Sequence, residues 1–197
     1  MPDPWAFGWD QIAAFLNVVV IGVATWVAWR SIRDWREERV DARQSEVAEQ
    51  ALVLASQAEE VFQHIRSSGG FAGEGSTRKP EPNEPAEEKN RLDSAFVPIE
   101  RINKEARFFE QVVEIKPRVA AVFGKGRVEP FNEFLAVRWE IIGEAHMLSQ
   151  LRQGGHFRTP EEQREHFDKT TERLARAVAS IESFAGPVLE SRLRPRA

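Results

Sequence analysis

An uncharged apolar run near the N-terminus constrains this chain most. No charged residue lies between Asp10 and Arg30, and the run reads IAAFLNVVVIGVATWVAW from Ile12 to Trp29. As a helix, this stretch spans about 28 Å at about 1.5 Å per residue, close to the hydrocarbon thickness of a bilayer. A helix in a soluble core usually shows one polar face, which this run lacks. The sequence therefore predicts a transmembrane helix over residues 11–30, after a short extracytoplasmic N-terminus, residues 1–10.

The charges that flank the run predict its orientation. Residues 1–29 contain no Lys or Arg, and five arginines then follow directly: Arg30, Arg33, Arg36, Arg39 and Arg43. Basic residues near a span stay on the cytoplasmic side. We therefore expect a single-pass protein of the inner (plasma) membrane, with its N-terminus outside and its C-terminal domain in the cytoplasm. A cleavable signal peptide is disfavoured, because an arginine cluster follows the apolar run where a cleavage site would stand.

One amide side chain, Asn17, lies well inside the apolar run. An amide in hydrocarbon needs a hydrogen-bond partner, which a neighbouring helix can supply. Helical spacing puts Asn17 on one stripe with Ile21, Thr25 and Ala28, and Ala24 with Ala28 forms a small-xxx-small pair. The sequence thus predicts a membrane helix–helix contact through these five residues. The alternative is an amide that is tolerated by tilting or bonds to its own backbone.

A second apolar pattern follows the arginines, with spacings of three and four residues. Its members are Val40, Gln44, Val47, Ala51, Leu54, Ala58, Val61 and Ile65. Ala48, Ala55 and Phe62 widen the stripe, which favours packing on the chain's own helices over a narrow two-stranded coiled coil. We predict a stalk helix over residues 31–66 that continues the membrane helix and packs with a helical bundle.

The next segment, residues 67–95, is rich in Gly, Pro and charges and is predicted to be a flexible loop. Residues 96–197 are predicted to be the cytoplasmic bundle, ending in a basic tail. Three helices are expected there: one that starts near Pro98 and kinks or ends at Pro117, one from Glu129 to Gly154, and one from Thr159 to Gly186–Pro187. The expected buried stripe of the first includes Val113, and that of the last includes Phe167.

No stretch has the alternating pattern of a strand. The predicted fold class is therefore all-α: one transmembrane helix that continues into a bundle of about four helices, with a long disordered loop.

The sequence offers few signs of catalytic chemistry. The chain has no cysteine, which excludes thiolate catalysis and Cys-ligated metals, and its net charge of −4 gives no basic surplus for nucleic acid. His146, His156 and His166 are ten residues apart and share no helical face. The loop FGKGR is interpreted as a plain turn. Arg101, whose neighbours alternate in charge, is assigned to a solvated helix face.

Three functional classes remain from the sequence. The favoured one is a non-enzymatic, membrane-anchored interaction or scaffold domain that binds the lipid bilayer and a protein partner or another copy of itself. It uses no cofactor, metal, nucleic acid or small-molecule substrate. The second is a membrane effector or channel subunit that assembles through Asn17 and Thr25. The third is an enzyme whose site gathers Glu140, Glu144, His146 and His166.

Overall fold

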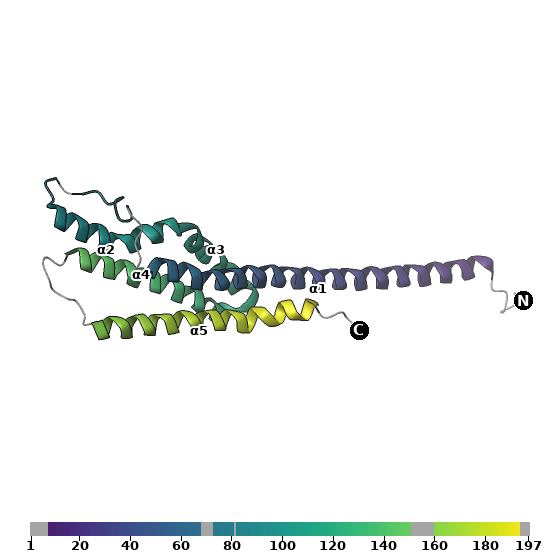
Figure 1. The fold of residues 1–197 in the computed structure, drawn as a ribbon. Helices are drawn as coiled ribbons and strands as arrows, with labels where there is room; N and C mark the ends of the chain where they lie inside the picture. Colours follow the sequence, from purple (N-terminus) through teal and green to yellow (C-terminus); the bar gives the residue numbers. More distant parts are fainter. Residues whose placement is uncertain (1–7, 68–72, 81, 151–159, 194–197) are drawn as a thin grey trace, which may run out of the picture. The chain divides into compact units, whose positions relative to one another are not determined.

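The computed structural model describes residues 8–67, 73–80, 82–150 and 160–193; these residues are mostly helical and contain no strand (Figure 1). Its elements are α1 (Trp9–Arg66), α2 (Ala86–Lys104), α3 (Ala106–Phe123), the 3₁₀ helix η1 (Lys125–Val128), α4 (Glu129–Gln150) and α5 (Pro160–Leu193). The predicted all-α class is confirmed for these residues. The chain divides into two units, Met1–Arg43 and Gln44–Ala197, and each is considered by itself.

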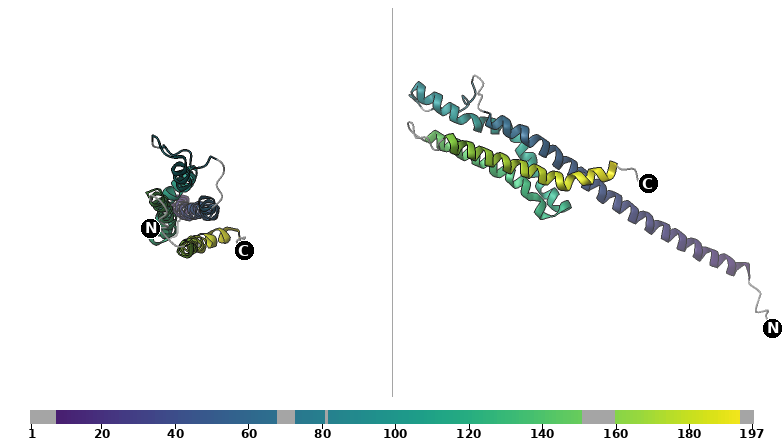
Figure 2. Two further views of the ribbon diagram at one scale, coloured as in Figure 1. Left: turned by 60° about the vertical axis from the view of Figure 1, so that its left-hand side comes forward. Right: turned by 60° about the horizontal axis from the view of Figure 1, so that its bottom comes forward.

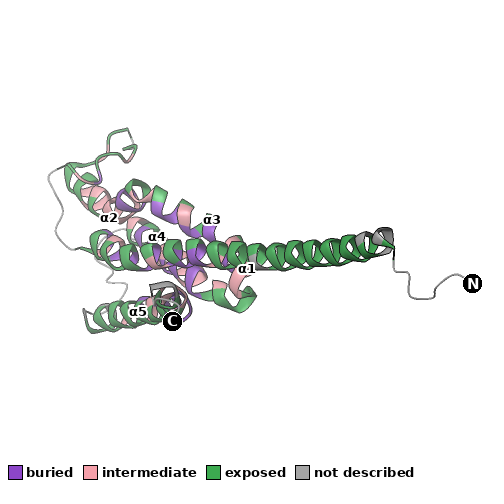
Figure 3. Cartoon of the chain, turned by 90° about the vertical axis from the view of Figure 1, so that its right-hand side faces the viewer, coloured by how far each residue is buried: buried purple, intermediate pink, exposed green. Residues whose placement is uncertain are grey.

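The first unit consists of the N-terminal part of α1. Its described side chains from Ile12 to Arg43 are all exposed (Figure 3). The run contains no proline, which would interrupt a helix, and only one glycine, Gly22. By length and composition, α1 is the one helix among the described residues that is apolar enough to cross a membrane.

The core of the second unit is built on the remainder of α1. Val47, Ala51, Leu54, Ala58 and Ile65 are buried there, as the spacing predicts. The residues that widen the stripe, Ala48, Ala55 and Phe62, are buried as well. The stalk therefore packs into the bundle, but only from Ser45 onward, since residues 31–43 are exposed wherever their side chains are described.

In this core, one cluster of phenylalanines joins α1, α3 and α4, and a separate ring pair joins α3 to α5. Phe62 of α1 lies 5.9 Å from Phe109 of α3 and 6.2 Å from Phe134 of α4, between ring centroids. Phe123 at the end of α3 lies 5.0 Å from Phe184 of α5. Such ring pairs add stability beyond the area that they bury. Around this cluster, α4 packs against both α2 and α5 (Figure 2).

Three prolines lie inside helices, so the helix start expected near Pro98 and the helix end expected at Gly186–Pro187 are wrong. Pro98 is within α2, Pro117 within α3, and Pro187 within α5, which continues to Leu193. An internal proline removes one backbone hydrogen bond, at a cost of about 3 kcal/mol or more. Pro117 and Pro187 are exposed, so water can reach the carbonyls that they leave unpaired. Apolar residues beyond them, such as Val119 and Leu189, continue to pack on the core and offset the cost.

The helix expected from Pro98 to Pro117 is instead divided at Glu105. Glu105 separates α2 from α3 with φ −90° and ψ 17°. Within α3, Val112 is fully buried together with Phe109 and Ile115, whereas Val113 is 52% exposed. The predicted core position of Val113 is therefore wrong.

The segment predicted to be a flexible loop is partly helical. Helix α2 begins at Ala86, twelve residues before Pro98, and Pro85 precedes its first residue. Pro85 is the N-cap residue, with the extended ψ of 145° that precedes a helix. Glu87 and Glu88 then lie in the first turn, where the helix dipole favours negative charge.

Candidate functional site

The apolar segment of α1, residues 12–29, is uncovered along its length. None of its most apolar stretch is buried (Figure 3). Large side chains such as Phe15, Val20 and Ile21 are 63–69% exposed. Water-soluble chains rarely leave so large a contiguous apolar surface open.

The five residues predicted to make a membrane contact all lie in this segment. Asn17, Ile21, Ala24 and Ala28 recur at spacings of four, three and four, which places them on one side of α1. All four are exposed, as is Thr25. The Thr25 hydroxyl donates a hydrogen bond to the Ile21 carbonyl at 2.8 Å. Thr25 is thus satisfied within its own helix, which leaves Asn17 as the polar group of the predicted contact.

The arginine segment, residues 30–43, follows the apolar segment directly. Three of its guanidinium groups lie over indole rings one turn earlier: Arg30 over Trp26 at 5.7 Å, Arg33 over Trp29 at 4.7 Å, and Arg39 over Trp35 at 3.9 Å. Cation–π contacts of this kind contribute about 0.5–1 kcal/mol at exposed sites. They combine a charge with an amphipathic ring, which suits the boundary between hydrocarbon and water.

In the second unit, a buried arginine holds the C-terminal end of α1. Arg101 of α2 is only 1% exposed. Its Nη1 donates to the carbonyls of His64 and Ser67, at 3.1 and 2.7 Å, and its Nη2 donates to Oε2 of Glu74 at 2.7 Å. A helix end leaves carbonyls without intrahelical donors, and a cation there also complements the helix dipole.

Glu100, the neighbour of Arg101, fixes the preceding segment onto α2. Its Oε2 accepts hydrogen bonds from the Gly75 N–H at 2.7 Å and the Thr77 hydroxyl at 3.1 Å, and Lys104 Nζ lies 3.0 Å from Oε1. The hydrogen bond from Lys104, followed by those from Gly75 and Thr77, lowers the pKa of Glu100 against the opposing effect of burial. The carboxylate is thus stabilised in its charged form.

Another arginine adds a second attachment to the same segment. Arg78 donates to Asp93 of α2 at 3.1 Å and to Glu84 at 2.5 Å. These contacts, with those of Glu100 and Arg101, attach residues 74–78 to α2. We call this group of contacts the α2 clamp.

A third charged cluster joins α4, α5 and the last turn of α1. Arg173 of α5 donates to Glu133 at 2.9 Å and to Glu140 at 2.7 Å, both on α4. His166 Nε2 lies 2.6 Å from Oε1 of Glu144. Arg66 contacts the Thr171 hydroxyl at 3.4 Å. Glu133, Glu140 and Glu144 share one side of α4, so the cluster runs along the seam between α4 and α5.

Burial and charge act in opposite directions on the two arginines of this cluster. Burial lowers the pKa of Arg66, and the nearby carboxylates of Glu144 and Glu140 partly counter that effect. Hydrogen bonding to Glu140, and then to Glu133, raises the pKa of Arg173 against burial. Arg173 therefore stays charged and links α5 to α4 through two carboxylates.

The structure brings together three of the four residues named for an enzymatic site. Glu140, Glu144 and His166 belong to the seam, whereas His146 is exposed two residues beyond Glu144, on another side of α4. His156 lies outside the described residues. Within the described part of the chain, no group of three or more His, Cys, Asp or Glu side chains could hold a metal ion.

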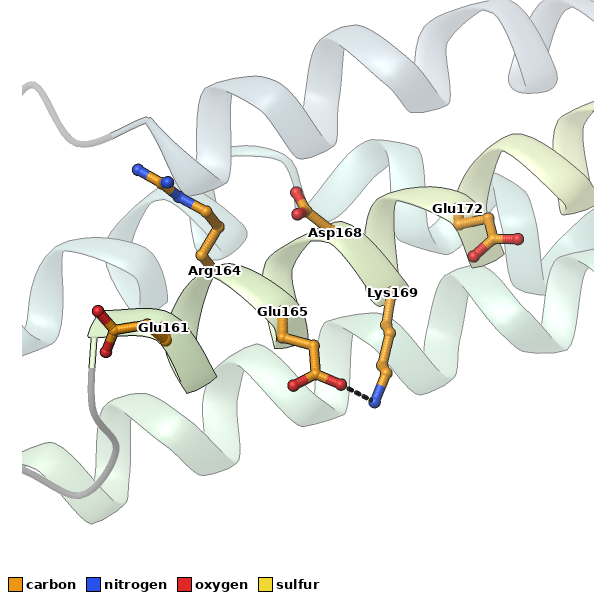
Figure 4. Close-up of a pocket in the computed structure, with 6 residues that line it drawn as sticks. All are labelled: Glu161, Arg164, Glu165, Asp168, Lys169 and Glu172. Carbon is orange, nitrogen blue, oxygen red and sulfur yellow. Dashed lines mark ion pairs between the residues drawn. The ribbon is translucent and has the colours of Figure 1, made fainter.

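One shallow pocket lies on the outer surface of α5 (Figure 4). Its lining residues are Glu161, Arg164, Glu165, Asp168, Lys169 and Glu172, all exposed. Lys169 forms an ion pair with Glu165 at 2.6 Å. Because a single helix supplies every side chain, no facing wall excludes water. The pocket therefore lacks the desolvated environment that a small-molecule site requires.

Sequence reasoning missed the α2 clamp. It assigned Arg101 to a solvated helix face, whereas Arg101 and Glu100 are buried. Alternating charges do indicate a solvated face when the helix is considered alone. The burial of Arg101 depends on where α1 ends, and no local pattern reports that position. The glycines of the preceding segment were the available signal, since Gly73 and Gly75 both adopt positive φ.

Comparisons with known proteins give no further guide to the site. No family model, curated protein or solved structure matches the chain.

Proposed function

We propose that this chain is a single-pass membrane protein that presents a helical interaction domain to the cytoplasm. Residues 11–30 form the membrane span, the N-terminus lies outside, and the bundle that follows binds protein partners. The observation that carries the proposal is the apolar segment of α1, which is uncovered along its length and is followed by the arginine segment. A bilayer would cover the apolar segment and retain the arginine segment on its cytoplasmic side.

The energetics of burial support a membrane as the covering partner. Transferring one large aliphatic or aromatic side chain out of water contributes about 1.5–3 kcal/mol. The apolar segment holds many such side chains on all sides of the helix. A single docked protein would cover one face, whereas hydrocarbon covers every face.

The surface of the bundle supports an interaction role. Ala136, Trp139, Gly143 and Met147 recur along the outward side of α4, and this strip carries no charge. Trp139 is 64% exposed. Tryptophan is enriched among the residues that dominate protein–protein binding energy. The charged residues Glu133, Glu140 and Glu144 face α5 instead.

The enzymatic alternative has one observation in its favour, the seam that gathers Glu140, Glu144 and His166. Its side chains are already engaged, however, because Glu140 binds Arg173 and Glu144 binds His166. A seam of paired charges between two helices accounts for these contacts without a substrate. The interaction domain therefore remains the better-supported proposal.

Membrane fractionation tests the anchor. The full chain is expected in the membrane pellet after carbonate extraction, and a chain lacking residues 1–30 in the supernatant. Ile21→Arg places a charge near the centre of the span, at a cost of about 2.5–3.5 kcal/mol, and is expected to lower the membrane-bound fraction. Val53→Arg is the matched control, since Val53 is exposed on the bundle. If the shortened chain stayed in the carbonate-washed pellet, the anchor would lie elsewhere.

Site-specific photocrosslinking tests the interaction surface. A photoreactive amino acid at position 139 is expected to give discrete protein adducts in cells, because Trp139 lies on the uncharged strip. The matched position is 113, where Val113 is exposed on α3 among charged neighbours. Equal adducts from both positions would mean that the strip has no special role.

A further inference from the structure

Helix α4 carries a single arginine or lysine, Arg138, and this cation has no acidic partner among the described residues. Its side chain is half-buried and makes neither an ion pair nor a hydrogen bond with them. Its Nε is buried without an acceptor, whereas Nη1 and Nη2 keep access to solvent. Buried polar groups are normally paired, so an unpaired one in a native fold calls for an explanation.

The carboxylates of α4 are engaged elsewhere. Three of them are paired in the seam with α5: Glu133, Glu140 and Glu144. The fourth, Glu129, accepts a hydrogen bond from the Asn132 amide in the first turn of the helix. The neighbours of Arg138 three and four positions away are all apolar: Phe134, Leu135, Ile141 and Ile142. Helix α4 therefore offers this cation no charge of opposite sign.

Two aromatic rings position the guanidinium group of Arg138 instead. Its central carbon lies 4.8 Å from the centroid of the Phe109 ring on α3 and 5.5 Å from that of Trp139. Phe109 is 2% exposed and Trp139 is 64% exposed, so the group lies at the boundary between the core and solvent. Ring contacts attract the positive charge but give its N–H donors no acceptor. The guanidinium is thus held in place while its terminal donors stay free.

An apolar surface adjoins this cation. With 3.6 residues per turn, Ile142 and Leu135 lie about 40° and 60° around α4 from Arg138, and Trp139 lies about 100° around it in the same direction. Leu135 and Ile142 are partly buried against the core. They connect the cation to the exposed indole of Trp139. We call these four residues, Leu135, Arg138, Trp139 and Ile142, the Arg138 surface.

We propose that the Arg138 surface binds a protein partner through a carboxylate, an aspartate or glutamate side chain that lies beside an apolar residue of that partner. Nη1 and Nη2 of Arg138 donate to the carboxylate, and the apolar residue packs on Trp139. Arginine is suited to this role because its planar fork matches a carboxylate. The inference rests on the proposed function, since it names the chemistry of the partner that the bundle binds.

The composition of the surface favours a protein carboxylate over a nucleic acid. Nucleic-acid binding depends on several basic side chains that follow the phosphates. The Arg138 surface has one, and the helix that carries it holds four glutamates, which repel a polyanion. A single arginine beside an exposed tryptophan is instead the pair of residue types that dominates protein–protein binding energy.

Selection from a random phage-displayed peptide library tests the proposal, with the full chain held in phosphatidylcholine nanodiscs. The selected peptides are expected to be enriched in Asp or Glu beside Leu, Ile or an aromatic residue. Arg138→Met is expected to weaken binding of the most enriched peptide about tenfold or more. Replacing that peptide's acidic residue by its amide is expected to cause the same loss, and the two losses are not expected to add. The amide peptide leaves the protein unchanged, so this arm does not depend on how the variant folds.

Matched variants separate recognition from packing. Arg118→Met removes one charge from an arginine that is already paired with Glu46, and is expected to leave peptide binding unchanged. Arg138→Lys keeps the charge but loses the fork, and is expected to give an intermediate loss. Arg138→Met is not expected to lower the melting temperature, because it removes an unpaired buried donor. A variant that melts well below the natural chain yet still binds the peptide would limit Arg138 to packing and overturn the proposal.

The remaining outcomes assign the surface to other occupants. Peptides selected without acidic residues would overturn the proposal, whereas discrete photocrosslinks at position 139 would still support the proposed function. Enriched peptides that match a segment of this chain would make a second copy the occupant and overturn the assignment to another protein. A single-stranded oligonucleotide that displaces the peptides, and that Arg138→Met no longer binds, would assign the surface to nucleic acid.

Discussion

At the scale of single residues, the α2 clamp shows how a glycine-rich segment becomes ordered. Gly75 has φ +82°, and a Cβ added there would lie 2.0 Å from the Asp93 carbonyl oxygen. Only glycine lets the backbone approach α2 closely enough for the Gly75 N–H to reach Glu100. Gly73 also has positive φ, at +94°, but a Cβ there would meet nothing within 4 Å.

This difference predicts unequal effects of two similar substitutions. Gly73→Ala is expected to cost about 1–2 kcal/mol, the penalty of a left-handed alanine. Gly75→Ala adds the clash with Asp93 and is expected to cost about 1–3 kcal/mol more. Urea unfolding of the full chain in detergent, together with the rate of proteolysis within residues 73–85, measures both. Equal losses would show that the close approach to Asp93 contributes nothing.

The lowered pKa of Glu100 predicts that the stability contributed by the α2 clamp depends on pH. Its pKa is lowered in the folded state, chiefly by the hydrogen bond from Lys104, so its stabilising effect is complete above about pH 4.3, the pKa of an unperturbed glutamate. The effect is lost as the pH falls through the lowered value. The difference in free energy of unfolding between the natural chain and Glu100→Gln is therefore expected to shrink on acidification. A difference that stayed constant from pH 6 down to the acid limit of folding would contradict this role.

Residue-level burial was only partly predictable. Val112 is fully buried and Val113 is 52% exposed, and the periodicity of apolar residues alone did not distinguish these two adjacent valines. Phe167 was expected in the core but is 48% exposed, with Arg66 lying over its ring at 4.9 Å. Hydrophobicity alone does not distinguish an aromatic residue of the core from one at the surface that makes a cation–π contact.

At the scale of elements, the spacing of apolar residues predicted the helices better than their ends. The stripe of α1 from Val47 to Ile65 is buried where the spacing placed it. The prolines were poor markers of helix ends, since Pro98, Pro117 and Pro187 all lie inside helices. Proline ends a helix only when packing beyond it does not offset the lost hydrogen bond.

Within the bundle, the buried and exposed sides of α1 predict unequal losses of stability when a side chain is replaced by alanine. Phe62 is 2% exposed and contacts three other phenylalanines, so Phe62→Ala is expected to cost about 3–5 kcal/mol. Val53 is 48% exposed on the same helix, and Val53→Ala is expected to change stability by less than about 0.5 kcal/mol. Thermal unfolding of each variant in detergent measures the difference. Similar losses for both would show that α1 packs elsewhere.

At the scale of the whole molecule, α1 contains two kinds of surface. Residues 12–43 are exposed wherever their side chains are described, and burial begins at Ser45. The sequence predicted the buried stripe from Val47 to Ile65, but it also placed Val40 in that stripe, and Val40 is 56% exposed. It did not reveal the seam between α4 and α5 or the α2 clamp, since these depend on contacts between residues distant in the chain.

The central claim is that the chain crosses the membrane once, with its bundle inside. Single cysteines introduced into the cysteine-free chain test it directly. Asp3→Cys and Ser183→Cys would be treated with a membrane-impermeant maleimide in right-side-out vesicles, before and after permeabilisation. The account predicts that position 3 reacts at once, whereas position 183, exposed on α5, reacts only after permeabilisation. Immediate labelling of position 183 in sealed vesicles would contradict the proposed topology.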